Sequence, residues 1–240
     1  MTRALKRFAL TGSVAIGLAA IVFACVVGAA WAHGVQGKDA AFVAGSSGPQ
    51  IIPFLYLGAK HMVTGYDHLL FILGVIFFLY RLTHVAIYVT LFSIGHSITL
   101  LAGVLGDIHV NPYLVDAVVG LSVAYKAFDN LGGFVRLFGF QPDLRGAVFG
   151  FGLVHGFGLA TKLQDISLSP DGLVTNMLAF NVGVELGQLI ALSAMLLLII
   201  WWRMRKNFEG QAVVANAVLL CAGFLLTQYQ LIGYFMERGA

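Results

Sequence analysis

The sequence predicts an all-α membrane protein, a polytopic helical bundle with six transmembrane helices after an N-terminal signal segment. Of the 240 residues, 59% are hydrophobic and only 10% are charged, whereas soluble domains carry about 25% charged residues. The mean hydropathy is +0.89. Apolar runs of about 16 to 30 residues recur along the chain, and about 20 helical residues cross a bilayer. We therefore exclude a soluble fold and expect the lipid bilayer as a partner.

The first expected element is an export signal over residues 1–32. The chain begins with three basic side chains, those of Arg3, Lys6 and Arg7. An apolar stretch follows and ends in Ala30-Trp31-Ala32, a small-x-small pattern typical of a cleavage site. The stretch is longer than usual, so cleavage and retention as an anchor both stay open. Residues 33–48 are predicted to form an exposed, flexible arm, because they include a polar Gly/Ser stretch.

The remaining residues, 49–240, are predicted to form one domain of six spans. The apolar runs lie near residues 49–80, 84–105, 112–131, 145–162, 172–202 and 211–235. The first run is expected to be compound, because Gly65 permits a helical break. The fourth is short and rich in glycine, which lets helices approach closely. Such small-residue faces either close the bundle or join copies, so a homo-oligomer or an accessory partner stays open.

Basic residues predict the orientation of the spans. They fall in alternate loops, at Arg81, at Arg136 and Arg145, and at Arg203 and Arg205. Basic loops face the cytoplasm. The mature N-terminus and the C-terminus are therefore expected in the periplasm, with the chain in the inner membrane. The formal net charge of +3 lies in short clusters beside the apolar runs, so it carries information about the orientation of the spans. No sequence motif indicates a nucleic-acid partner. The two cysteines lie in separate apolar segments, which favours neither a disulfide nor a thiolate site.

Several ionisable side chains fall within the predicted spans. An ionisable residue in the hydrocarbon core costs at least about 2.5 to 3.5 kcal/mol, so it indicates a functional site. The predicted topology places the candidates at similar depth in four spans. The candidate metal ligands are His61, Asp67, His68, His96, His155 and Glu185. Glu185 fits metal or proton handling as well as a structural role beside Asn181 or Gln188.

This donor set predicts which ion is bound. Imidazole nitrogens and carboxylate oxygens without thiolates suit Ni²⁺, Co²⁺, Zn²⁺ or Cu²⁺, whereas Mg²⁺ and Ca²⁺ prefer oxygen alone. His61 and His68 are seven residues apart, so both would share one side of an unbroken helix, and a break at Gly65 would alter that. Because ligands must be deprotonated, binding should weaken as the pH falls through about 6.5.

Four segments resemble the HupE/UreJ family of membrane proteins. The first is HMVTGYDHLLF at residues 61–71, a His-x5-Asp-His pattern. The others are FSIGHSITL at 92–100, FGLVHGFG at 151–158 and FNVGVELGQ at 180–188. The resemblance implies a signal-bearing, six-span permease for nickel or cobalt in the inner membrane of bacteria that assemble hydrogenase or urease.

The expected function is import of a divalent transition metal, most directly nickel, from the periplasm to the cytoplasm. No nucleotide-binding motif is present, so ATP would need a partner protein. Two alternatives stay open. One is an intramembrane zinc-dependent hydrolase, with three histidines on zinc, Asp67 or Glu185 as general base and Ser97 in support. The other is a metal-binding accessory subunit of a membrane complex.

Overall fold

The computed structural model describes residues 37–79, 82–166, 169–205 and 207–239. The signal segment predicted for residues 1–32 lies outside these ranges. Helices make up the described structure, which contains no strand in these ranges. Their bounds are Lys38–Gly45 (α2), Ile51–Thr64 (α3), Tyr66–Ile76 (α4), Leu82–Gly106 (α5), Pro112–Asn130 (α6), Gly133–Phe138 (α7), Leu144–Gln164 (α8), Leu173–Arg203 (α9) and Phe208–Gly239 (α10).

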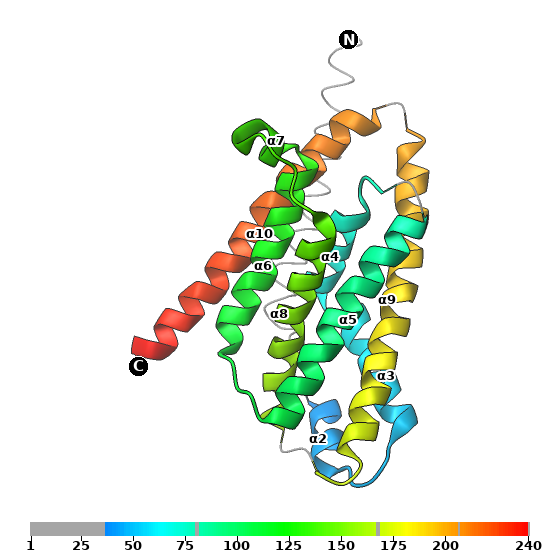
Figure 1. Ribbon diagram of the computed structural model, residues 1–240, viewed down its shortest axis with the longest axis vertical. Coiled ribbons are helices and arrows are strands. Elements are labelled where there is room, and N and C mark those ends of the chain that lie inside the picture. Colours follow the sequence, from blue (N-terminus) through cyan, green and yellow to red (C-terminus); the bar gives the residue numbers. More distant parts are fainter. Residues whose placement is uncertain (1–36, 80–81, 167–168, 206, 240) are drawn as a thin grey trace.

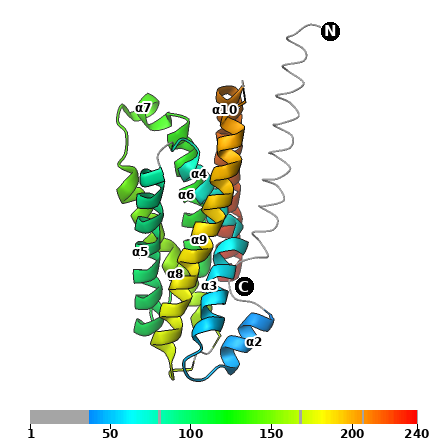
Figure 2. The same ribbon diagram turned by 90° about the vertical axis from the view of Figure 1, so that its right-hand side faces the viewer.

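The long helices run up and down beside one another (Figure 1). We call the end of the bundle where α3 and α9 begin the lower end, and the end that carries α7 the upper end, as in Figure 1. The helices α3 and α4 follow one another upward as a broken column. The closest packing pairs are α3 with α9, α5 with α8, and α6 with α10, and Figure 2 shows the first two pairs from the side.

Four described helices are long and apolar enough to cross a membrane, namely α5, α8, α9 and α10. This confirms the predicted class of membrane-type helical protein. The remaining expected spans do not combine the length and the apolar composition of these four helices. The helix α6 has 19 residues but carries Asp116, Lys126 and Asp129. The helices α3 and α4 have 14 and 11 residues, so each alone is shorter than a bilayer requires. The count of six therefore stays a prediction.

Glycines set the distance between the packed helices. On α5, a Cβ added at Gly95 would lie 2.6 Å from the carbonyl oxygen of Phe149. On α8, added Cβ atoms at Gly152 and Gly156 would meet the backbone of α5 at Phe92 and His96. The backbones of α5 and α8 are thus in direct contact, as small residues allow between membrane helices. In contrast, a Cβ at Gly150 would meet nothing within 4 Å.

The segment expected to be a flexible arm contains a helix instead. α2 spans Lys38–Gly45, and its Val43 side chain is only 2% exposed within the hydrophobic core. Lys60 on α3 donates a hydrogen bond of 2.6 Å to Asp39 of α2. The buried Val43 side chain and the ion pair hold this segment against α3 near the lower end. The Gly and Ser content of the segment did not indicate that it would form a packed helix.

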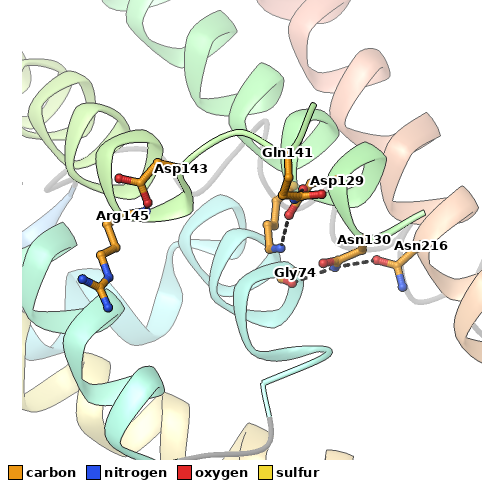
Figure 3. Close-up of polar contacts among 8 residues, drawn as sticks. Gly74, Asp129, Asn130, Gln141, Asp143, Arg145 and Asn216 are labelled. Atoms are coloured by element: carbon orange, nitrogen blue, oxygen red, sulfur yellow. Dashed lines mark hydrogen bonds and ion pairs between the residues drawn. The ribbon is translucent and has the colours of Figure 1, made fainter. Parts of the chain in front are cut away.

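A polar cluster joins three helices near the upper end (Figure 3). The Asn130 amide donates to the carbonyl oxygen of Gly74 on α4 and to Oδ1 of Asn216 on α10, both at 2.8 Å. Lys126 pairs with Asp129 at 2.6 Å, and Gln141 donates to the same carboxylate. Because these polar groups are satisfied by one another, α6 can carry them among apolar neighbours.

Two further polar contacts fix α4 and α8. The guanidinium of Arg203 donates to the carbonyl oxygens of Ile76, Phe77 and Leu79, at 3.1, 2.6 and 3.0 Å. These carbonyls lie at or just beyond the C-terminus of α4, where cations are favoured. Near the lower end, Lys162 of α8 pairs with Asp116 of α6 at 2.9 Å. The pair is less than one-fifth exposed, with side-chain exposures of 19% and 11%.

Candidate metal centre

Three histidines from three helical segments meet inside the bundle. His61 lies in the last turn of α3, His68 in the first turn of α4, and His96 near the middle of α5. One nitrogen from each ring lies within 4.8 Å of the others. Two ligands on one ion are separated by at most about 4.2 Å when each bond is about 2.1 Å. Ring movements of less than about 1 Å would therefore let the three nitrogens share an ion.

The break at Gly65 brings His61 and His68 together. In an unbroken helix, residues seven apart are separated by about 10.5 Å along the axis. Here the two ring centroids are 5.1 Å apart. Gly65 has an extended conformation, with φ −74° and ψ 98°, and it ends α3 and begins α4. The predicted break is confirmed, and it creates the histidine pair.

His96 is the clearest sign that this cluster receives a ligand. Its side chain is 1% exposed. Neither ring nitrogen has a hydrogen-bond partner among the described residues. A buried polar atom without a partner costs about 1 to 3 kcal/mol, so an imidazole is a poor choice for a position that needs only packing. A metal ion would use one of these nitrogens, and the glycine-mediated contact between α5 and α8 holds His96 in place.

His155 on α8 extends the cluster. Its ring centroid lies 5.0 Å from that of His68. Its Nδ1 lies 2.8 Å from the carbonyl oxygen of Phe151. Because a carbonyl only accepts hydrogen bonds, Nδ1 carries the proton, and the lone pair of the neutral ring is on Nε2. This backbone contact orients the ring as second-layer hydrogen bonds do at metal sites.

Aromatic rings close the upper side of the cluster. Phe92 lies 4.9 Å from His155 and 6.2 Å from His96, measured between ring centroids, and Phe71 lies 5.9 Å from His155. Above these rings is a cavity of about 10 Å³, lined in part by Phe92 and Gln188. That volume corresponds to about one water molecule. An ion at the histidines is thus separated from the upper end by packed side chains.

The other two predicted ligands are placed differently. Asp67 lies in the first turn of α4 beside His68, but its side chain is outside the described part of the structure. Glu185 does not join the histidine group. It is exposed and lines a groove between α5 and α9, together with Ser93 and Ser97. Ser97, which the sequence associates with a hydrolase site, therefore faces this groove together with Glu185.

Asn181 is a buried polar residue of α9 that was not among the predicted ligands. It follows Phe180, whose ring centroid is 6.1 Å from that of His61. The Asn181 side chain is 9% exposed, and neither atom of its amide has a hydrogen-bond partner among the described residues. The sequence shows an amide four residues before Glu185, but it does not reveal that this amide is buried without a partner.

Membrane-type helices around a buried histidine cluster define the class, a helical membrane protein with a candidate site for a transition metal. The chain belongs to the HupE/UreJ family, because a family model described as HupE / UreJ protein matches residues 37–238. The resemblance noted in the sequence is thereby confirmed. No curated protein and no solved structure shows significant similarity to the chain.

Proposed function

We propose that the chain is a permease of the bacterial inner membrane that moves a divalent transition metal, nickel or cobalt, from the periplasm to the cytoplasm. The observation that carries the proposal is the triad of the half-buried His61 and the buried His68 and His96, in which neither nitrogen of His96 has a partner among the described residues. Neutral imidazoles from separate helices suit Ni²⁺ and Co²⁺. Their position inside a membrane-type bundle suits passage of an ion better than storage at a surface.

The direction of transport is inferred from charge. Arg136 lies on α7, Arg145 at the start of α8 and Arg203 at the end of α9, and these helix ends lie at the upper end (Figure 1). Asp107 follows the end of α5 and Asp171 precedes the start of α9, both at the lower end. Basic loops favour the cytoplasmic side, so the upper end would face the cytoplasm. An ion would then enter from the lower end, bind the triad, and pass Phe71 and Phe92 on its way inward. Asp67, His155 and Glu185 remain proposed contributors.

The proposal is tested by metal uptake into proteoliposomes. Nickel, cobalt, zinc and copper would be compared for the parent and for His68→Ala and Asp67→Asn. His109→Ala is the matched control, because His109 is an exposed loop histidine whose nearest partner is Asp107. We expect saturable uptake of nickel or cobalt that is lost in His68→Ala and kept in His109→Ala.

The opposite results have definite meanings. If the parent holds stoichiometric metal tightly but takes up none, the protein is a metal-binding subunit or an enzyme and the permease proposal is wrong. If uptake persists unchanged in His68→Ala, the triad is not the route of the ion.

A further inference from the structure

A groove on the flank of the bundle contains the one carboxylate of the α9 span. The groove lies between α5 and α9 and has a volume of about 240 Å³. We call it the Glu185 groove. The residues that matter here are Glu185 on α9 and Thr90, Ser93 and Ser97 on α5, with Ile94 and Ile98 at the rim. Ile94 and Ile98 are 47% and 50% exposed, so the groove opens among side chains that suit lipid.

Among the residues that the structure describes, none supplies a counter-charge to Glu185 in this groove. No described Lys, Arg or His lines it, and none forms an ion pair with Glu185. The lysine and the histidines of the helices packed against α9, namely Lys60, His61, His68, His84 and His96, are also absent from its lining. An ionised carboxylate near the middle of a membrane-type helix is costly without a partner, and a bound cation would offset that cost.

One hydroxyl group of the groove, that of Ser93, is held as an acceptor. Ser93 Oγ donates its proton to Gln188 Oε1 at 2.7 Å, and Gln188 is 1% exposed. Because that proton is used on the buried side, the lone pairs of Ser93 Oγ are available to the groove. Thr90 and Ser97 add two further hydroxyl oxygens. The groove therefore offers one carboxylate and up to three neutral oxygens, which suit a cation.

The donor set and the charge select the kind of cation. Oxygen ligands without nitrogen or sulfur favour hard ions and contrast with the imidazoles of the triad. A single carboxylate neutralises one positive charge, whereas a divalent ion would leave a net positive charge on an apolar flank. We propose that the Glu185 groove binds a small monovalent cation, Na⁺, through the Glu185 carboxylate and the hydroxyls of Ser93, Ser97 and Thr90.

This site is physically connected to the triad through one helix. His96 lies between Ser93 and Ser97 on α5, so the same two helical turns hold ligands of both sites. Binding free energies of two linked sites change reciprocally. If Na⁺ in the groove alters the affinity of the triad for a transition metal, the metal alters the affinity for Na⁺ by the same factor. The Na⁺ site itself does not depend on the permease proposal, since it can be measured with no transition metal present.

The test uses the full chain in nanodiscs, freed of transition metals. Thermal unfolding is followed while NaCl replaces N-methylglucamine chloride at constant ionic strength, and bound ²²Na⁺ is measured by equilibrium dialysis. We expect a rise in Tm specific to Na⁺ and saturable ²²Na⁺ binding. Glu185→Gln should remove both, and Ser97→Ala should weaken Na⁺ binding about tenfold, if the lost contact between the hydroxyl oxygen and the ion is worth about as much as a hydrogen bond to a charged group.

Ser193→Ala is the matched control. Ser193 is an exposed hydroxyl on the same helix as Glu185, and it donates to its own helix at the Leu189 carbonyl, 2.7 Å away. It should bind Na⁺ like the parent. Circular dichroism of Glu185→Gln establishes that this variant is folded. The proposal is overturned if the folded parent binds no ²²Na⁺, if Glu185→Gln binds it equally, or if Tm responds to pH alone and not to Na⁺.

Discussion

Substitution of Gly95 by alanine tests whether helix packing positions the metal ligands. Gly95 precedes His96 on α5, and an added Cβ would lie 2.6 Å from the carbonyl oxygen of Phe149 and 3.0 Å from the amide nitrogen of Leu153. Both atoms belong to the backbone of α8, so neither can rotate away. Ordinary contacts of a Cβ begin near 3.4 Å, so α5 and α8 must separate locally by about 0.8 Å.

That displacement is large compared with what the triad tolerates. Sites of this kind need their ligands within about 0.5 Å of the productive geometry, and the triad nitrogens already spread over 4.8 Å. We therefore expect Gly95→Ala to lower nickel affinity about 10- to 100-fold, as loss of a supporting contact does at metal sites. Overpacking should also lower the free energy of unfolding by about 1 to 3 kcal/mol.

Competition with a calibrated chelator measures the affinity, and thermal unfolding in nanodiscs measures the stability. Gly150→Ala is the control, because an added Cβ there meets nothing within 4 Å, and a change from Gly to Ala within a helix favours the helix by up to about 1 kcal/mol. Parent-like nickel affinity in Gly95→Ala would show that His96 does not depend on the contact between α5 and α8, and our account of the site would then be wrong.

Three further predictions concern other contacts. Lys162→Met leaves the Asp116 carboxylate unpaired and should lower the free energy of unfolding, measured by thermal unfolding, by about 3 kcal/mol. The double variant with Asp116→Asn should recover most of that loss, and an equal loss in both variants would contradict this reasoning. Asn181→Leu removes two buried amide atoms that have no partner among the described residues, so it should raise Tm without metal. A lower Tm would refute this. In Arg203→Lys, the ammonium group cannot reach all three carbonyl oxygens at the end of α4. Chemical unfolding should therefore show a free energy of unfolding lower by about 2 kcal/mol. An unchanged midpoint would show that other groups satisfy these carbonyls.

Hydrophobic runs and glycines allowed much of the fold to be predicted. Runs expected near 112–131 and 172–202 correspond to α6 at Pro112–Asn130 and α9 at Leu173–Arg203. This agreement has a simple cause, since a backbone in lipid must satisfy its own hydrogen bonds as helix. The break at Gly65 was also predictable, because glycine is the residue in the first run that most readily leaves the helical conformation.

The faces of the helices were less predictable. A soluble helix shows its buried face by a stripe of apolar residues, but α9 is apolar all round, with Leu189 and Ile190 exposed and Val184 and Leu192 buried. The sequence therefore could place Glu185 at a depth but could not show that it faces outward between α5 and α9. The helix α2 was missed for another reason, because its anchor is the long-range pair Asp39–Lys60.

The break at Gly65 also changes how related sites should be searched for in membrane sequences. Two ligands on one rigid helix must follow its periodicity, and residues seven apart are then too distant to share an ion. Two ligands on either side of a glycine are released from that rule, since their separation is set by two backbone torsions. His61 and His68, 5.1 Å apart between ring centroids, indicate that the informative pattern is a ligand pair straddling a helix-breaking residue.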